Sequence, residues 1–319
     1  MTPNAPHASL IDAIGRTPLV PLTCVGRGLP VPLLAKCEHL NPTGSVKDRL
    51  ALALIEDGER RGLLQPGGTM IEATAGNTGL GLAMIGAIRG YALVCVMPEK
   101  MSIDKRLALT AAGAKVVITP NAPLDSPEHF QNVARRMAEE NGWFLTDQFA
   151  SPANARVHEQ VTGPEILSQT GGVIGAFVAG AGTGGTITGV GRCLREHAPH
   201  ARVVLADPIG SGLAHWVEHG VPGTDAAYQI EGIGTSRPPV IMDRSVIDAA
   251  ESVSDDESFA MTRRLWAEEG QFVGGSSGTA VVAAIRVARR SPPGPVIVLL
   301  ADAWDRYRSK EWAQVRPAP

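Results

Sequence analysis

The chain has 319 residues, a formal net charge of −3 and a hydrophobic fraction of 44%. A chain of this length is too long for one small core, so we expect two domains. With 36 glycines and 24 prolines the composition is that of a turn-rich globular protein, and its charge gives no support to nucleic-acid or membrane-surface binding.

The four cysteines, Cys24, Cys37, Cys95 and Cys193, are scattered and form no C-x-x-C pair. This pattern indicates reduced thiols and excludes a disulfide scaffold or a cysteine-based metal site. The first 19 residues lack a basic segment followed by an apolar core, so we expect no export signal. No apolar run approaches the ~20 residues of a membrane-spanning helix. We therefore expect a cytoplasmic protein without a metal site.

The first informative element is a helix that begins close to Lys47. Ser45 is a natural N-cap, Asp48 is expected to complete a capping box, and Gly62 is expected to end the helix. A cation at the positive end of a helix is unfavourable by roughly 0.3–1 kcal/mol. That is too little to make the amine reactive, so burial would have to supply most of the pKa shift. A lysine taken at random at a helix start is usually just exposed, but this one also suits an imine to an aldehyde cofactor.

Short apolar runs then alternate with helical patterns. The expected strands are 70–73, 91–97, 115–119, 176–179, 203–206 and 296–300. Such runs are typical of parallel sheets covered by helices on both faces. The predicted fold class is therefore α/β, with two three-layer αβα domains and mostly parallel sheets. Ligands of such sheets bind beyond the carboxyl ends of the strands, so the loops that follow strands are the candidate sites.

The first such loop joins a predicted strand to a helix and contains Thr74, Ala75, Gly76, Asn77 and Thr78. Hydroxyl and amide side chains beside the backbone amides of a helix start form a pocket for a carboxylate. Taken alone, an ordinary capped turn is the more common explanation of this pattern.

The second loop contains Gly182, Thr183, Gly184, Gly185 and Thr186. Its glycines let the backbone wrap around an anion, and its threonines add two hydroxyl groups. The spacing differs from the P-loop and from the G-x-G-x-x-G of a dinucleotide site, which is the rival explanation. A single phosphate monoester is the better match.

The third loop opens a helix and includes Ser276 within a Gly-Gly-Ser-Ser-Gly sequence. Alone it would be a glycine-rich helix cap. Together, an aldehyde for Lys47, a phosphate for the second loop and a ring contacted by Asn77 and Ser276 describe one ligand, pyridoxal 5′-phosphate.

With these motifs in this order, residues 14 to about 307 resemble the cysteine synthase and cystathionine β-synthase family of fold-type II pyridoxal-phosphate enzymes. The details are closer to the cystathionine β-synthase catalytic core. The resemblance implies a tryptophan synthase β-like fold, with a smaller mobile substrate-side domain at 40–152. It places a larger cofactor-anchoring domain at 10–39 and 153–312, and it implies a homodimer.

The resemblance also assigns roles to residues. Lys47 is both catalytic and covalently bound to the cofactor, Asn77 binds the ring hydroxyl, and Ser276 contacts the pyridine nitrogen. The phosphate is held by Gly182, Thr183, Gly184, Gly185 and Thr186. The amino-acid substrate is bound by Thr74, Gly76, Thr78 and Gln148, and Gly232 belongs to a stretch that borders the active site.

Three departures from the family pattern bear on the substrate. One is Ala301-Asp302-Ala303, which replaces the usual proline-led turn after the last strand. Ala75 stands where the family usually has a serine that touches the substrate carboxylate. Arg237 follows Gly-Ile-Gly in a pattern similar to synthases that add an amino acid's nitrogen to phosphoserine, and its planar fork suits a substrate's negative charge.

The expected reaction is β-replacement on L-serine, O-acetylserine or O-phosphoserine with a thiol or sulfide, through an aminoacrylate, giving cystathionine or cysteine. A neutral serine at the pyridine nitrogen suits loss of a β-substituent better than transamination. The alternatives are replacement by an amino-acid nitrogen, which gives a diaminopropionate precursor, and dehydration of serine or threonine. The remaining alternative is a non-catalytic binding subunit with the same fold.

Overall fold

The computed structural model describes residues 7–74, 76–224 and 226–314, which separate into two compact units. The smaller unit holds residues 7–17 and Leu40–Asp147, and the larger holds Pro18–His39 and residues 148–314. This division differs from the expected one at both ends of the smaller unit. Residues 10–17 belong to it because Ile11 and Ile14 pack against its core. Residues 148–152 belong instead to the larger unit.

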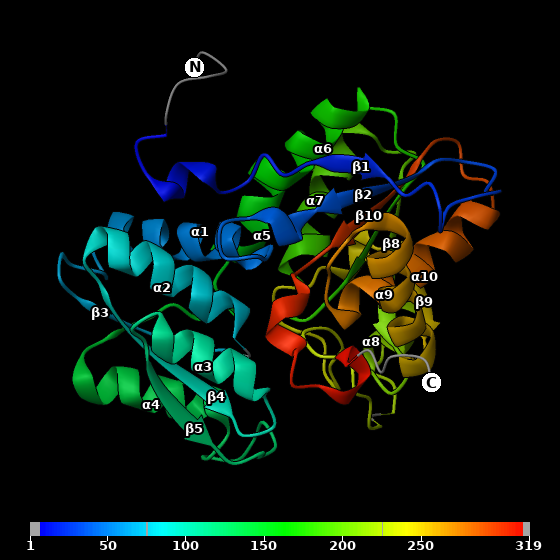
Figure 1. Ribbon diagram of the computed structural model, residues 1–319. Helices are drawn as coiled ribbons and strands as arrows, with labels where there is room; N and C mark the ends of the chain where they lie inside the picture. The colour runs from blue at the N-terminus through cyan, green and yellow to red at the C-terminus, as the bar shows by residue number, and fades with distance from the viewer. Residues whose placement is uncertain (1–6, 75, 225, 315–319) are drawn as a thin grey trace. The chain divides into compact units, whose positions relative to one another are not determined.

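The smaller unit is a three-layer αβα structure around a parallel sheet with strand order β5-β4-β3-β6. Its strands are β3 (Thr69–Ala73), β4 (Ala92–Pro98), β5 (Lys115–Thr119) and β6 (Phe144–Leu145). Its helices are α1 (Lys47–Arg60), α2 (Asn77–Arg89), α3 (Ile103–Ala111) and α4 (Phe130–Asn141), preceded by a 3-10 turn at Leu10–Ala13. Helices α1, α2 and α3 pack on the sheet face that carries Met70 and Cys95, whereas α4 packs on the face of Ile71 and Val94 (Figure 1).

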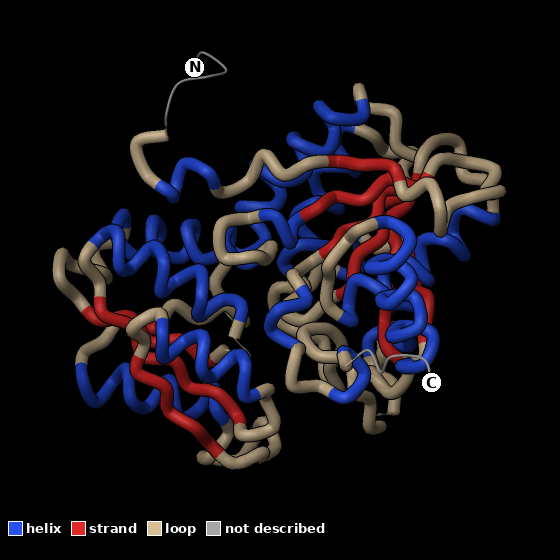
Figure 2. Tube along the Cα trace, viewed as in Figure 1, coloured by secondary structure: helices blue, strands red, loops and turns tan. Residues whose placement is uncertain are grey.

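The larger unit repeats this plan around a sheet with strand order β1-β2-β10-β7-β8-β9, in which only the β1–β2 pair is antiparallel. Its strands are β1 (Leu19–Pro21), β2 (Leu33–Cys37), β7 (Ala176–Gly180), β8 (Arg202–Pro208), β9 (Ala249–Val253) and β10 (Val296–Leu300). One face of this sheet is covered by α9 (Asp255–Glu269) and α10 (Gly275–Arg289). The other is covered by α6 (Gly163–Thr170), α7 (Gly185–His197) and α8 (Leu213–His219) (Figure 2).

The helices of the larger unit are α5 (Ala153–Val157), α6 (Gly163–Thr170), α7 (Gly185–His197), α8 (Leu213–His219), α9 (Asp255–Glu269) and α10 (Gly275–Arg289). A π-helical turn, His158–Thr162, joins α5 to α6. Short 3-10 turns lie at Glu38–Leu40, Arg244–Val246, Trp304–Tyr307 and Glu311–Ala313. Among the described helices, none has both the length and the apolar character needed to cross a membrane.

The predicted α/β fold class is confirmed, and the strands expected at 115–119 and 296–300 match β5 and β10. The interior strand β2 is not among the expected strands because Lys36 interrupts its apolar run. That side chain is fully buried, and its Nζ lies 2.5 Å from Glu165 Oε1. A buried ion pair of this kind cannot be recognised from one sequence segment, since the partner is far away in the chain.

Candidate active site

Lys47 is the first residue of α1, at the position that the sequence indicated, and its side chain is half-buried. The predicted capping box is wrong. The Asp48 carboxylate instead accepts hydrogen bonds from the Thr43 amide, at 2.7 Å, and from the Thr43 hydroxyl. Ser45 Oγ accepts from the Lys47 amide at 3.3 Å. The turn before Lys47 is therefore fixed by local side-chain hydrogen bonds rather than by a capping box.

The 74–78 loop connects β3 to α2. Thr74 is buried, and its hydroxyl oxygen accepts a hydrogen bond from the Gly76 amide at 2.9 Å. Gly76 has φ +126°, a conformation that favours glycine. Helix α2 begins at Asn77 without a side-chain cap in the described structure, so its positive end faces the loop. Ala75 lies outside the described residues.

A close contact between α1 and α2 brings Lys47 and the 74–78 loop to the same part of the smaller unit. A Cβ at Gly81 of α2 would lie 2.8 Å from Ala51 Cβ and 3.3 Å from the Asp48 Cα of α1. Glycine therefore allows the start of α1, with Lys47, to approach the first turns of α2. Lys47 and the 74–78 loop thus lie at the starts of two neighbouring helices, α1 and α2.

In the larger unit, the 182–186 loop leads from β7 into α7. Thr183 and Thr186 are 5% and 8% exposed. Gly184 is the N-cap with φ +80°, and no described side chain caps the helix. A helix N-terminus of this kind presents amide groups and a positive dipole end to an anion.

Gly232, also predicted as a site residue of this unit, lies against the same loop. A Cβ at Gly182 would lie 2.4 Å from the Gly232 carbonyl oxygen, so the loop packs directly on the stretch around Gly232. Gly234 also donates its amide hydrogen to the Ala181 carbonyl at 2.8 Å. The stretch around Gly232 therefore borders the 182–186 loop.

Two buried residues that we did not predict hold the loop. Asn154 Nδ2 donates to Thr183 Oγ1 at 2.9 Å and to the Gln148 carbonyl at 2.8 Å, which links Gln148 to the loop. His158 Nε2 lies 3.2 Å from Thr186 Oγ1. These residues belong to no recognised motif. The only signal in the sequence is their separation by four positions in a helical segment.

Ser276 and Arg237 differ in their surroundings. Ser276 is the second residue of α10 and is 5% exposed, and α10 has no side-chain cap among the described residues. Arg237 is exposed, and its amide donates to Thr235 Oγ1 at 3.4 Å. Its guanidinium forms no ion pair or hydrogen bond with the described part of the chain. Arg237 is therefore accessible to an anionic ligand, whereas Ser276 can meet only a ligand that enters the fold.

A buried carboxylate of the larger unit, Asp207, lies next to the last residue of β8. It accepts a hydrogen bond from the Ala214 amide at 2.8 Å, while its Oδ1 has no partner in the described structure. Burial raises the pKa of Asp207 to about 6, against the hydrogen bonds that lower it. The cysteines are all free, and burial raises the pKa of Cys37 to about 12, so that thiol is a poor nucleophile.

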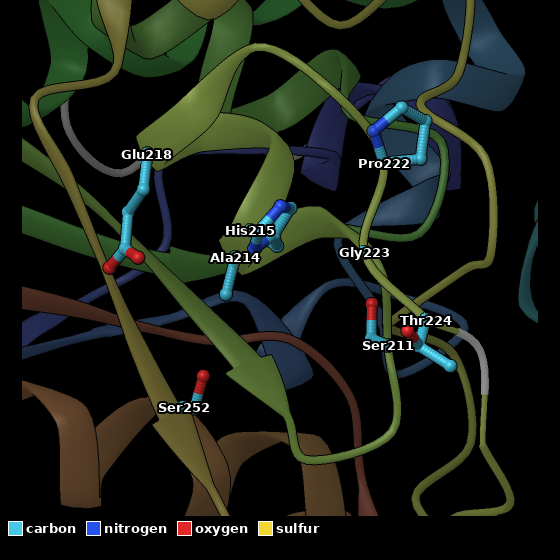
Figure 3. A pocket seen from close by; sticks show the side chains of 8 residues that line it. All are labelled: Ser211, Ala214, His215, Glu218, Pro222, Gly223, Thr224 and Ser252. Carbon is cyan, nitrogen blue, oxygen red and sulfur yellow. The ribbon is translucent and has the colours of Figure 1, made fainter.

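The structure also contains a polar hollow of about 380 Å³ beside α8 (Figure 3). Figure 3 shows His215 and Glu218 projecting from that helix, with Ser211, Thr224 and Ser252 around them. None of the residues predicted to bind cofactor or substrate lines this hollow. It is therefore separate from the candidate site.

The similarity of this chain to known proteins agrees with the anion-binding geometry of the 182–186 loop. A family model described as "Pyridoxal-phosphate dependent enzyme" matches residues 10–302. Cystathionine beta-synthase of Oryctolagus cuniculus is 46% identical over 308 residues, covering 94% of this chain and 55% of that protein. Cysteine synthase of Staphylococcus aureus is 40% identical over 306 residues, covering 95% and 96%.

A solved structure, O-ureido-L-serine synthase, is similar with a TM-score of 0.90 and 38% identity, covering 99% of this chain and 98% of that one. The chain spans about half the length of the mammalian cystathionine beta-synthases that it matches. These likenesses confirm the resemblance and the fold type inferred from the sequence.

Proposed function

Because this chain belongs to the family of pyridoxal-phosphate dependent enzymes, we propose that it catalyses β-replacement on L-serine or an O-activated serine. The nucleophile is a thiol or sulfide, and the product is cystathionine or cysteine. The names of the relatives, cystathionine beta-synthase and cysteine synthase, support this choice. The observation that carries the proposal is the buried 182–186 loop at the uncapped start of α7.

The residues present fit the cofactor. Its phosphate is an anion that only accepts hydrogen bonds, and the 182–186 loop offers two buried threonine hydroxyls beside a helix N-terminus. Gly182, Gly184 and Gly185 leave no room for side chains, since a Cβ at each would lie within 2.6 Å of a neighbouring atom. We assign the phosphate to this loop, the ring hydroxyl to Asn77 and the pyridine nitrogen to Ser276.

When bound, the cofactor supplies an electron sink for the bonding electrons released at the substrate's α-carbon. In our proposal, Lys47 Nζ holds the cofactor aldehyde and moves the α-proton. Thr74, Gly76 and Thr78 bind the substrate carboxylate at the start of α2, with Ala75 in the same loop, and Gln148 and Gly232 contact the substrate from the larger unit. Ser276, a neutral hydroxyl, leaves the ring nitrogen less positive than a carboxylate would.

An amino-acid nitrogen is the second candidate nucleophile. The guanidinium of the exposed Arg237 has no hydrogen bond or ion pair with the described part of the chain. Arg237 follows Gly-Ile-Gly-Thr-Ser and is placed to bind an extra negative charge. Such a charge would be present on O-phosphoserine or on an acidic amino acid. We also propose that the enzyme is a cytoplasmic homodimer that acts on small amino acids, and the free cysteines support a reducing location.

Steady-state assays test the proposal. Serine, O-acetylserine and O-phosphoserine are each combined with sulfide, homocysteine and amino-acid nucleophiles, and the amino-acid product is identified by mass spectrometry. We expect a product that joins the serine carbon skeleton to sulfide or homocysteine. Pyruvate formed from serine without a nucleophile, or 2-oxobutyrate formed from added threonine, would identify a dehydratase instead. A purified protein without visible absorbance would identify a non-catalytic subunit.

A further inference from the structure

A helical segment of the larger unit places two buried polar side chains against the 182–186 loop. Asn154 and His158 are each 1% exposed. Asn154 Nδ2 lies 2.9 Å from Thr183 Oγ1, and His158 Nε2 lies 3.2 Å from Thr186 Oγ1. Each threonine hydroxyl of the loop therefore has its own buried partner, and both partners come from residues 153–162.

The residues of segment 153–162 and those of α7 together allow the two elements to approach closely. Asn154 and His158 are four positions apart, so they share one face of the segment. On α7, a Cβ at Gly185 would lie 1.9 Å from Asn154 Oδ1, and one at Gly189 would lie 2.7 Å from His158 Cβ. The contact exists only because glycine occupies both positions. The π-helical turn that begins at His158 is a further irregularity of the kind found at functional sites.

The chemistry of the partners fixes the direction of the hydrogen bonds. An amide nitrogen only donates, so Thr183 Oγ1 accepts from Asn154 and its own hydrogen points elsewhere. His158 Nδ1 lies 3.0 Å from Thr162 Oγ1. If the Thr162 hydroxyl donates to Nδ1, the proton of a neutral imidazole is on Nε2, and His158 donates to Thr186. Both loop threonines then keep their hydroxyl hydrogens for another acceptor.

We infer that Asn154 and His158 are positioning residues that turn the hydroxyl hydrogens of Thr183 and Thr186 toward the cofactor phosphate. A phosphate dianion accepts hydrogen bonds and donates none, so a threonine serves it only when its hydrogen is free. This inference rests on the proposed assignment of the phosphate to the 182–186 loop.

The experiment compares pyridoxal 5′-phosphate with pyridoxal, which lacks the phosphate. Both ligands carry the aldehyde that Lys47 would bind. The ratio of their dissociation constants for the apoprotein therefore measures the contribution of the phosphate group to binding. His158→Leu removes the donor, and we expect pyridoxal phosphate to bind about 3- to 10-fold more weakly, the range of one neutral hydrogen bond. Asn154→Asp replaces the donor with a charged acceptor, and we expect a loss of about 10- to 100-fold. Pyridoxal affinity should change less than about twofold in both, below that range.

His158→Gln is the conservative variant, because its amide nitrogen can replace Nε2 as a donor, and it should retain the wild-type ratio. Thr262→Val is the matched control. Thr262 is fully buried on α9 and donates to the Ser258 carbonyl, so this variant loses a buried hydrogen bond without touching the loop. Its ratio should also stay unchanged. If His158→Leu does not fold, Thr162→Val tests the same imidazole proton, with an expected loss of about 2- to 5-fold for pyridoxal phosphate alone.

Equal losses for the two ligands in the Asn154 and His158 variants would overturn the inference and leave these residues a purely structural role. A His158→Gln variant as weak as His158→Leu would do the same. Thr186→Val separates this failure from that of the proposed function. If Thr186→Val itself leaves the ratio unchanged, the phosphate does not bind at this loop, and the cofactor assignment fails with it.

Discussion

The 74–78 and 182–186 loops occupy equivalent places in the two units but are supported differently. Each follows a parallel strand and opens a helix without a described side-chain cap. The first is braced from within, by the Thr74 hydroxyl on the Gly76 amide. The second is held from outside, by Asn154, His158 and the stretch around Gly232.

This difference fits two different ligands. A loop that is braced by one of its own hydroxyls, and whose neighbour at Gly76 is the long side chain of Lys105, can change shape more readily, which suits a substrate that enters and leaves in each cycle. A loop held by buried groups of other elements is pre-organised, which suits a cofactor that stays bound. The following predictions test whether the 74–78 loop binds the substrate and the 182–186 loop binds the cofactor.

Lys47→Ala should have the largest effect. Loss of the amine that holds the aldehyde and moves the proton should lower turnover by about 10³-fold or more and remove the visible absorbance of the lysine-bound cofactor. Cofactor should still bind, more weakly, because the phosphate loop belongs to the other unit. Absorbance spectra and steady-state rates check this, and a variant that keeps both colour and turnover would exclude Lys47 as the cofactor lysine.

Asp207→Asn tests the electrostatics of the larger unit. Burial raises the pKa of Asp207 from 3.8 to about 6, so the folded protein binds this proton more tightly than the unfolded chain. Its stabilising effect is complete below pH ~4 and is lost as the pH rises through about 6. Asn does not titrate, so the stability of the variant relative to wild type should increase over that window by up to about 3 kcal/mol. Denaturant unfolding at pH 4 to 8 measures it, and a constant difference would contradict the raised pKa.

Arg237→Ala should penalise one anionic substrate. Loss of a charge-assisted hydrogen bond costs roughly 1.5–3 kcal/mol, which is about 10- to 150-fold in kcat/KM. Reactions of O-acetylserine with sulfide should be spared. O-phosphoserine, homocysteine and acidic amino acids are the substrates to compare. A uniform change below about threefold on every substrate, well under that range, would mean that Arg237 takes no part in recognition.

The pair Gly76→Ala and Gly184→Ala sharpens the comparison directly. Both glycines have positive φ, +126° and +80°, so the backbone strain of an alanine costs about 1–3 kcal/mol at either position. An added Cβ would lie 3.0 Å from the Lys105 side chain at Gly76, and 2.6 Å from Met242 Cβ at Gly184. Gly76→Ala should raise KM for the amino-acid substrate, and Gly184→Ala should weaken cofactor binding. If both variants alter the same parameter, the proposed division between the loops is wrong.

Much of this fold was predictable because its signals are local. An apolar run long enough to cross a sheet identifies a buried strand, as at Lys115–Thr119 and Val296–Leu300. Glycine and threonine between strand and helix likewise mark the candidate loops, since backbone conformation and amide exposure depend on neighbouring residues. Lys47 was placed at a helix start for the same reason.

What the sequence by itself determined, then, is the alternation of strands and helices, the loops that carry polar groups and the family. Only the tertiary structure decided which distant groups meet: Lys36 with Glu165, and Asn154 and His158 with the loop threonines. Burial and hydrogen-bond geometry depend on how separate elements pack, and no periodicity within one segment encodes the partner that another segment will supply.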